Sequence, residues 1–251
     1  MQITSSFSRY EKKYLLTVEQ KEELLGRIGE YIQADAYSMG NAMYRICNIY
    51  FDTENSDVIR YSLSSPFYKE KLRLRTYDTP KSMDQNAFLE IKKKVNRLVL
   101  KRRATLTLGQ AYEFLETRRR PQALSYINNQ VLDEIEYYLA VNPVRPAVYI
   151  AYDRAAYYDK NDPSLRITFD KNIITRRDDL YLEHGVYGQN LLGENEWLME
   201  IKVSSAMPLW LARPLVQMGL FPRSFSKYGT EYANTVNENR DIKRNEDSYD
   251  D

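Results

Sequence analysis

The strongest constraint on the fold of this chain is a set of short segments in which lysine or arginine recurs at every second residue. Residues 69–75, for example, read KEKLRLR. Side chains of a β-strand alternate between the two faces of its sheet, so Lys71, Arg73 and Arg75 would share one face and the intervening leucines the other. Related patterns occur at residues 9–13, 90–94, 101–103 and 200–202. Several such strands in one sheet predict one apolar face and one face crowded with positive charge.

A face of this kind predicts a polyanionic ligand, because crowded like charges are unfavourable unless they stay hydrated and meet an opposite charge. The whole chain is nearly neutral, with 36 Lys and Arg against 35 Asp and Glu and a formal net charge of +1. The positive field is therefore local, which argues against a nucleic-acid partner. A basic sheet that binds RNA would also interleave aromatic side chains with its cations, and residues 71–75 and 90–94 contain none.

Several other functional classes are disfavoured by what the sequence lacks. The only cysteine, Cys47, and the only histidine, His184, make disulfides, cysteine-based zinc sites and Ser-His or Cys-His catalysis improbable. We expect Cys47 in the core and His184 at the surface. No phosphate-binding loop of the G-x-x-x-x-G-K-[ST] type occurs. Since no apolar run reaches the roughly 20 residues of a membrane helix and the N-terminus lacks a signal peptide, the expected location is the cytoplasm.

The order of elements predicts an α+β protein. Apolar alternation predicts strands at about 7–15, 43–51, 67–77, 87–95, 98–106, 147–158, 165–170 and 196–204. Helices are predicted at about 18–33, from 107 to about 118, and at 122–140 and 208–218. About eight mostly antiparallel strands favour a β-barrel with a basic lumen and flanking helices. We expect one domain over residues 1–235 and a disordered acidic tail over 236–251.

The charged strands also carry carboxylates on their basic faces. Arginine binds phosphate bidentately and lysine as a point charge, whereas Glu11, Glu90 and Glu200 offer the hard oxygen ligands that Mg²⁺ or Mn²⁺ prefers. Cationic clamps beside a carboxylate-held metal suit phosphoryl transfer. One such strand alone is more often a solvated sheet face with ion pairs. Five or more with the same pattern favour a site.

Eight motifs occur in an order that extends this interpretation. They are RYEKKY at 9–14, IYFDT at 49–53, KLRLRTY at 71–77, FLEIK at 88–92, YDR at 152–154, LRITFD at 165–170, LMEIK at 198–202 and FSKY at 225–228. In this order the chain resembles, over about residues 7–232, the VTC domain family. That family is the polyphosphate polymerase branch of the triphosphate tunnel metalloenzymes, in the CYTH-like superfamily.

The resemblance implies an antiparallel barrel, or tunnel, in which the γ-phosphate of ATP is moved onto inorganic polyphosphate with Mn²⁺ or Mg²⁺ as cofactor. The catalytic residues that it implies are Lys13, Arg73, Arg75, Lys92, Arg154 and Arg166. Further phosphate contacts are expected from Lys71, Lys94, Lys101, Arg103, Lys202, Ser226 and Lys227. Glu200 would hold the metal, with Glu11 and Glu90 as further candidates. The terminal phosphate of the chain would be the nucleophile.

Two alternatives stay open. A triphosphatase would use water as the acceptor in the same tunnel, and a non-catalytic module would only bind polyphosphate. Hydrolytic relatives carry E-x-E-x-K on the first strand, whereas this chain has Arg9-x-Glu11-x-Lys13, which favours the polymerase. Membrane helices of eukaryotic members are missing from this sequence, so we expect a free-standing catalytic domain whose membrane attachment, if any, comes from a partner protein. The oligomeric state is left open.

Overall fold

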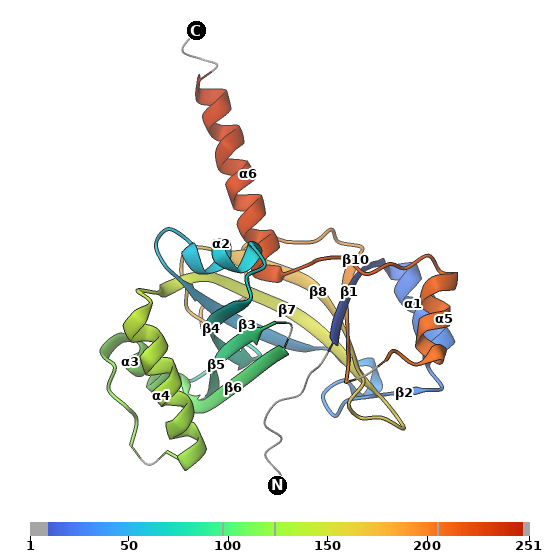
Figure 1. Ribbon diagram of the computed structural model, residues 1–251, viewed down its shortest axis with the longest axis horizontal. Coiled ribbons are helices and arrows are strands. Elements are labelled where there is room, and N and C mark those ends of the chain that lie inside the picture. Colours follow the sequence, from blue (N-terminus) through green and yellow to red (C-terminus); the bar gives the residue numbers. More distant parts are fainter. Residues whose placement is uncertain (1–9, 97, 123, 205, 248–251) are drawn as a thin grey trace.

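The structure is a computed structural model that describes residues 10–96, 98–122, 124–204 and 206–247 (Figure 1). Its strands are β1 Tyr10–Thr17, β2 Ile32–Ala34, β3 Tyr44–Asp52, β4 Tyr68–Tyr77, β5 Asn86–Val95, β6 Leu98–Thr107, β7 Arg145–Asp159, β8 Arg166–Arg176, β9 Gln189–Asn190 and β10 Glu196–Val203. Its helices are α1 Val18–Ile28, α2 Asp57–Leu63, α3 Leu108–Thr117, α4 Tyr126–Val141, α5 Leu209–Gln217 and α6 Lys227–Asp247, with a short 3₁₀ turn at Met39–Asn41. The expected α+β class is confirmed.

The strands form one antiparallel sheet in the order β1-β10-β8-β7-β3-β4-β5-β6, with β2 added beside β7 and β9 beside β8. The expectation of a closed barrel has to be corrected, because among the described residues no pairing joins the edge strands β1 and β6. The alternation of side chains assigns each strand its two faces but does not determine whether the two edge strands pair.

The open sheet is nevertheless strongly curled. In a flat sheet β1 and β5 would lie about 29 Å apart, six spacings of about 4.8 Å. Lys92 of β5 is close enough to Glu11 of β1 to help lower the pKa of that carboxyl, and charges separated by much more than about 10 Å are screened from each other. The charged side chains at the two ends of the sheet therefore face each other across the concave side.

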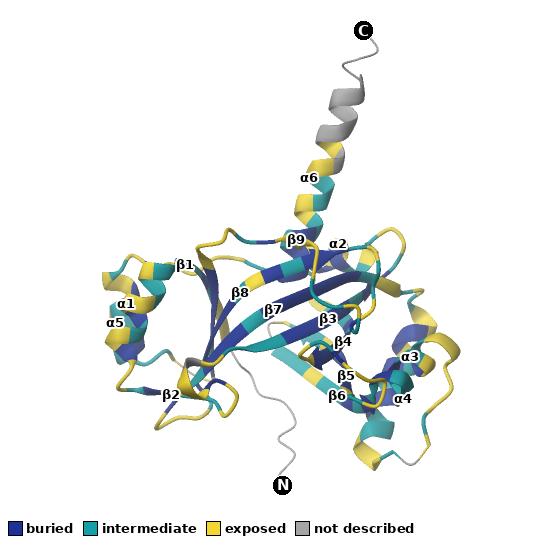
Figure 2. Ribbon diagram, turned by 180° about the vertical axis from the view of Figure 1, so that it is seen from behind, coloured by how far each residue is buried: buried dark blue, intermediate teal, exposed yellow. Residues whose placement is uncertain are grey.

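The apolar face of the sheet is buried under two helical layers, one near each edge (Figures 1 and 2). Helices α3 and α4 cover the β3–β6 half, where Leu72 and Leu74 are fully buried. Helices α1 and α5 cover the β1, β10 and β8 half, around Leu16, Leu24 and Ile201. The leucines that alternate with the cations thus lie in the core, which confirms the prediction that these strands have one apolar face and one charged face.

Local capping fixes where two helices begin. Thr17 with Gln20 and Thr107 with Gln110 form reciprocal capping boxes at the starts of α1 and α3. Helix α1 is shorter than expected: it ends at Ile28, and the chain returns as β2 to pair with β7. Cys47 is buried as expected, and the His184 side chain is 48 % exposed beside Asp179.

Two helices were not expected from the sequence. Helix α2 begins where the Asp52 carboxylate accepts hydrogen bonds from the backbone N–H groups of Val58 and Ile59. Helix α6 includes residues 236–247 of the segment in which a disordered tail was expected and projects away from the sheet (Figure 1), while residues 248–251 of that segment lie outside the described residues. Its first turns are anchored by Tyr228, which donates to Asp52, and by an ion pair of Glu231 with Arg177. A helix nucleated in this way propagates at little cost. No described helix is both long and apolar enough to span a membrane.

Candidate functional site

The concave side of the sheet, here called the basic face, collects charged side chains from all eight strands of the main path. The register of the paired strands brings these side chains together, because directly opposed residues point to the same face of a sheet. Lys13 lies opposite Glu200, Lys202 opposite Arg166, and Arg154 opposite Asp170. On the other half, Arg73 lies opposite Glu90 and Lys71 opposite Lys92. The charged face predicted from the alternation is thereby formed.

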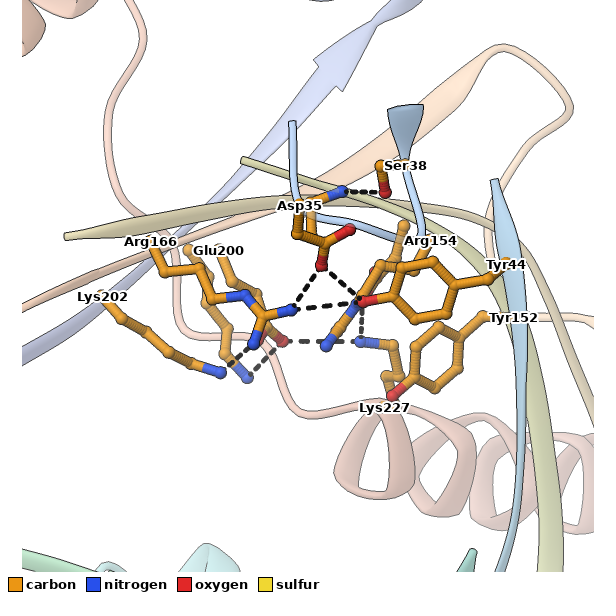
Figure 3. Close-up of polar contacts among 12 residues, drawn as sticks. Asp35, Ser38, Tyr44, Tyr152, Arg154, Arg166, Glu200, Lys202 and Lys227 are labelled. Carbon is orange, nitrogen blue, oxygen red and sulfur yellow. Dashed lines mark hydrogen bonds and ion pairs between the residues drawn. The ribbon is translucent and has the colours of Figure 1, made fainter. Parts of the chain in front are cut away.

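One cluster on this face is centred on Glu200 (Figure 3). Its carboxylate lies 3.3 Å from Lys13 Nζ, 3.4 Å from Lys227 Nζ and 3.5 Å from Lys202 Nζ. Burial alone would raise the pKa of Glu200, but Lys227, Lys13 and Lys202 outweigh it and hold the pKa well below the usual value. Glu200 is therefore an anion that three lysines face.

Asp170 anchors the floor beside that cluster. It is fully buried, accepts two hydrogen bonds from the Arg154 guanidinium at 2.6 and 2.7 Å, and lies 2.6 Å from Lys227 Nζ. Lys227 is the first residue of α6, so the start of this helix reaches into the face. Burial opposes the charge of Lys227, yet Asp170 and Glu200 raise its pKa above the ordinary value. Ser226 is used locally, since its hydroxyl accepts from the backbone N–H of Gly229.

A second cluster is centred on Glu90. This carboxylate is 1 % exposed and lies 2.6 Å from Arg73 Nε, 2.7 Å from Lys101 Nζ and 2.5 Å from Arg103 Nη2. Arg75 stands 3.9 Å away and is held by Asn48 at 2.8 Å. Burial would raise the pKa of Glu90, but Arg73 and Arg75 with the other two cations depress it far below its usual range. The arginines are thus held rigidly in place.

Three lysines of β4 and β5 lie near these clusters without an ion-pair partner in the described part of the chain. Among the described residues, no carboxylate comes within ion-pair distance of Lys71, Lys92 or Lys94. Burial and the neighbouring Lys69 and Lys92 lower the pKa of Lys71 to about 8, against a weaker opposing effect of Tyr50. Such a site is short of negative charge, and a phosphate chain would supply it.

The two ends of the face differ, as strand β3 shows. At its far end Tyr50 packs on Tyr228 of α6, with ring centroids 5.5 Å apart, within an apolar cluster that includes Ile59 of α2. This end is covered by α2 and α6 (Figure 1). Its first residue, Tyr44, lies about 20 Å away by strand geometry, beside an open cavity of about 380 Å³ that Arg166 also lines.

Arg166 links that cavity to the face. Its Nη2 donates to Asp35 at 3.0 Å and to the Tyr44 hydroxyl at 3.3 Å, while its buried Nε has no partner among the described groups. Of the residues predicted for the site, only Ser226 is engaged chiefly in its own helix turn. Arg9 lies outside the described residues. Asn48 and Tyr50 were not expected at the site. The alternation does place Asp170 on one face with Arg166, and Tyr152 with Arg154, but gives neither a role; in the structure the Tyr152 hydroxyl accepts from Arg75 at 3.3 Å.

Two carboxylates of the basic face lie close enough together to be considered as ligands of a divalent metal. Glu11 and Glu200 both lie within 3.3 Å of Lys13 Nζ, so their carboxylates are close together. Thr168, opposite Glu200, is 1 % exposed, and its hydroxyl has no partner within the described part of the chain. Among all the residues that the structure describes, no group of three or more His, Cys, Asp or Glu side chains could hold a metal ion. A metal here would need phosphate oxygens as its remaining ligands, which is usual for Mg²⁺.

Known proteins provide an independent comparison. The VTC domain model matches residues 8–236. Curated proteins give no match. A solved structure from Bacillus halodurans, provisionally described as an adenylate cyclase, is 15 % identical with a TM-score of 0.50 and covers 87 % of this chain and 95 % of its own. A Vibrio parahaemolyticus protein with the same provisional description has 11 % identity, a TM-score of 0.45 and coverages of 91 % and 99 %.

A third solved structure, from Pyrococcus horikoshii, has 13 % identity, a TM-score of 0.42 and coverages of 90 % and 99 %. Of the three structures, the one from Bacillus halodurans supports a shared fold, and at 15 % identity it supports nothing beyond the fold. The family match is the stronger finding because it spans nearly the whole described chain. This chain belongs to the VTC domain family.

Proposed function

We propose that this protein is a metal-dependent polyphosphate polymerase that transfers the γ-phosphate of ATP onto a growing inorganic polyphosphate chain. The observation that carries the proposal is the excess of cations on the basic face, above all the unpaired Lys71, Lys92 and Lys94. A row of cations along a curled sheet suits a ligand that presents negative charge at regular intervals, as a phosphate chain does.

The proposed residue roles follow from the contacts. Arg73 and Arg75, positioned by Glu90 and Asn48, bind phosphate oxygens on one side. Arg154 and Lys227, positioned by Asp170, do so on the other. A metal bound through Glu200 and Glu11 would neutralise charge on the transferred phosphoryl group.

The transfer needs no protein nucleophile. A terminal oxygen of the polyphosphate chain attacks the γ-phosphorus and forms the new P–O–P link, the bond between the γ-phosphorus and the β–γ bridging oxygen breaks, and ADP leaves with the electron pair. The protein aligns the two anions and offsets their repulsion. Water as acceptor is disfavoured because the carboxylate oxygens of Glu11 and Glu200 face lysines, which leaves them poor bases.

The first test is to incubate the protein with ATP and Mn²⁺ or Mg²⁺, resolve the products on a gel stained for polyphosphate, and assay ADP and free phosphate. Chains that grow with stoichiometric ADP would establish the polymerase. Free phosphate without chains would replace the proposal with a triphosphatase. Binding of polyphosphate without turnover with either metal would leave a binding module.

Glu200→Gln sharpens this test. Loss of the carboxylate should reduce turnover by about 100-fold or more, while affinity for polyphosphate is kept or increased because three lysines lose their counter-ion. The exposed Glu194→Gln, in the loop before β10, is the matched control. Unchanged turnover in Glu200→Gln would contradict the role given to Glu200.

A further inference from the structure

Three tyrosines gather at the uncovered end of the basic face. Tyr37 and Tyr77 are nearly parallel, with ring centroids 6.5 Å apart and planes inclined by 4°. Tyr44 completes the group, 5.7 Å from Tyr37 and 6.2 Å from Tyr77. The exposed fractions of Tyr37 and Tyr77 are 75 % and 40 %. Large aromatic side chains left this open offer flat surfaces on which a planar ligand group can stack.

These rings, here called the tyrosine mouth, line a real cavity. Its volume is about 380 Å³, within the range of small-ligand sites, and Asp35, Tyr158 and Arg166 contribute to its walls. A neighbouring cavity of about 440 Å³ shares Tyr44 and Tyr77. The space is large enough for a nucleobase and is open to solvent on one side.

The tyrosine mouth is continuous with both halves of the basic face. The Tyr44 hydroxyl accepts from Arg166, as Figure 3 shows, and the Tyr77 hydroxyl accepts from Arg103 at 3.4 Å. Tyr77 follows Arg75 by two residues on the same strand face, a separation of about 7 Å. A triphosphate held by Arg75 and Arg154 would therefore place its organic end within reach of the rings.

At the opposite end the described residues offer no comparable position, since Tyr50 and Tyr228 pack there in an apolar cluster under α2 and α6. We propose that the tyrosine mouth is the subsite that binds the nucleobase of the donor nucleoside triphosphate by stacking on Tyr37 and Tyr77. This inference rests on the proposed function only in taking the donor to be a nucleotide. Stacking does not read base edges, so it favours purines and discriminates weakly between them.

The test compares equilibrium binding of ATP and of inorganic tripolyphosphate without metal, so that neither is turned over. The wild type should bind ATP more tightly than the phosphate charge alone explains. Base stacking on one ring contributes roughly 1–3 kcal/mol, or about 5- to 150-fold in Kd. Tyr37→Ala and Tyr77→Ala should each weaken ATP binding at least about fivefold and leave tripolyphosphate binding unchanged.

Two further variants separate the causes. Tyr77→Phe keeps the ring and loses only the contact with Arg103, so ATP affinity should stay near the wild-type value. Tyr126→Ala removes a tyrosine with the same 75 % exposure from α4, away from the face, and serves as the control. Equal losses for ATP and tripolyphosphate, or no loss for either, would overturn the subsite. Because only binding is measured, the test is independent of polymerase activity. The tyrosine variants can lose ATP affinity in a protein that makes no polyphosphate, and they can keep it in an active polymerase.

Discussion

Affinity for a phosphate chain should fall as the pH rises through the range in which Lys71 and Lys101 lose their protons. Burial and neighbouring lysines lower the pKa of Lys71 to about 8 in the free protein. A bound polyanion favours the protonated amine, so the pKa of Lys71 is higher in the complex and binding takes up a proton. Affinity is therefore highest well below pH 8, where the amine is fully protonated, and falls as the pH rises through and above 8.

The size of the effect follows from that pKa. Between pH 6.5 and pH 9.0 the charged fraction of Lys71 falls from nearly all to about one tenth, which raises Kd about tenfold. Burial also lowers the pKa of Lys101, to about 7, despite the opposing charge of Glu90. Because its side chain is 36 % exposed, solvent screens Lys101, and we expect it to add less than about tenfold per pH unit.

The assay is calorimetric titration with inorganic tripolyphosphate at fixed ionic strength across this pH range. Lys71→Arg and Lys101→Arg keep a positive charge at every pH used, so each should flatten the rise in Kd. The exposed Lys81→Arg should leave it unchanged. Ionisation of the ligand itself acts in the opposite direction but is common to all variants and cancels in the comparison.

A wild-type pH profile that coincides with that of the Lys71→Arg and Lys101→Arg double variant would refute the reasoning. This result would mean that these amines stay charged throughout or do not meet phosphate.

Three stability predictions follow from buried polar contacts. Tyr228→Phe removes the hydrogen bond to Asp52 and should lower the free energy of unfolding by about 1–3 kcal/mol in urea denaturation, with Tyr232→Phe as the control. Arg154→Met leaves Asp170 buried with Lys227 alone and should cost about 3–5 kcal/mol by the same measurement; an unchanged midpoint would contradict the pairing. Burial is outweighed by cations at Asp170 and Glu200, whose pKa values lie below their ordinary ones, so their stabilisation is complete above about pH 5 and is lost as the pH falls further. Thermal melts should therefore be flat from pH 7 to 5 and decline below 5.

The sequence predicts this fold well wherever the signal is local. The alternation in β4, β5 and β10 and the capping boxes at Thr17 and Thr107 each depend on residues within one element. Helix α2 could not be predicted in this way because it has seven residues and its cap, Asp52, stands outside it at the end of β3. Helix α6 is likewise held by residues distant in the sequence, Asp52 and Arg177.

The same distinction explains what was predicted of the site. Alternation assigns a charge to a face, but only register and curvature decide which charges meet. Glu11, Glu90 and Glu200 were grouped by residue type, yet Glu90 sits among four cations on the far half, while Glu11 and Glu200 share Lys13. Glu90 therefore holds arginines in place, whereas the neighbouring carboxylates of Glu11 and Glu200 are the pair proposed to share a metal.

The distribution of counter-charge gives the basic face a direction. Carboxylates neutralise it around Asp170 and Glu200, next to the covered end, and again at Glu90. Lys71 of β4 and Lys92 and Lys94 of β5 have no ion-pair partner among the described residues. A bound polyanion is stabilised most beside cations that no carboxylate of the protein neutralises. The near-zero net charge of the chain is thus compatible with a strong local field, because most of the 35 Asp and Glu residues that balance its cations lie away from the basic face.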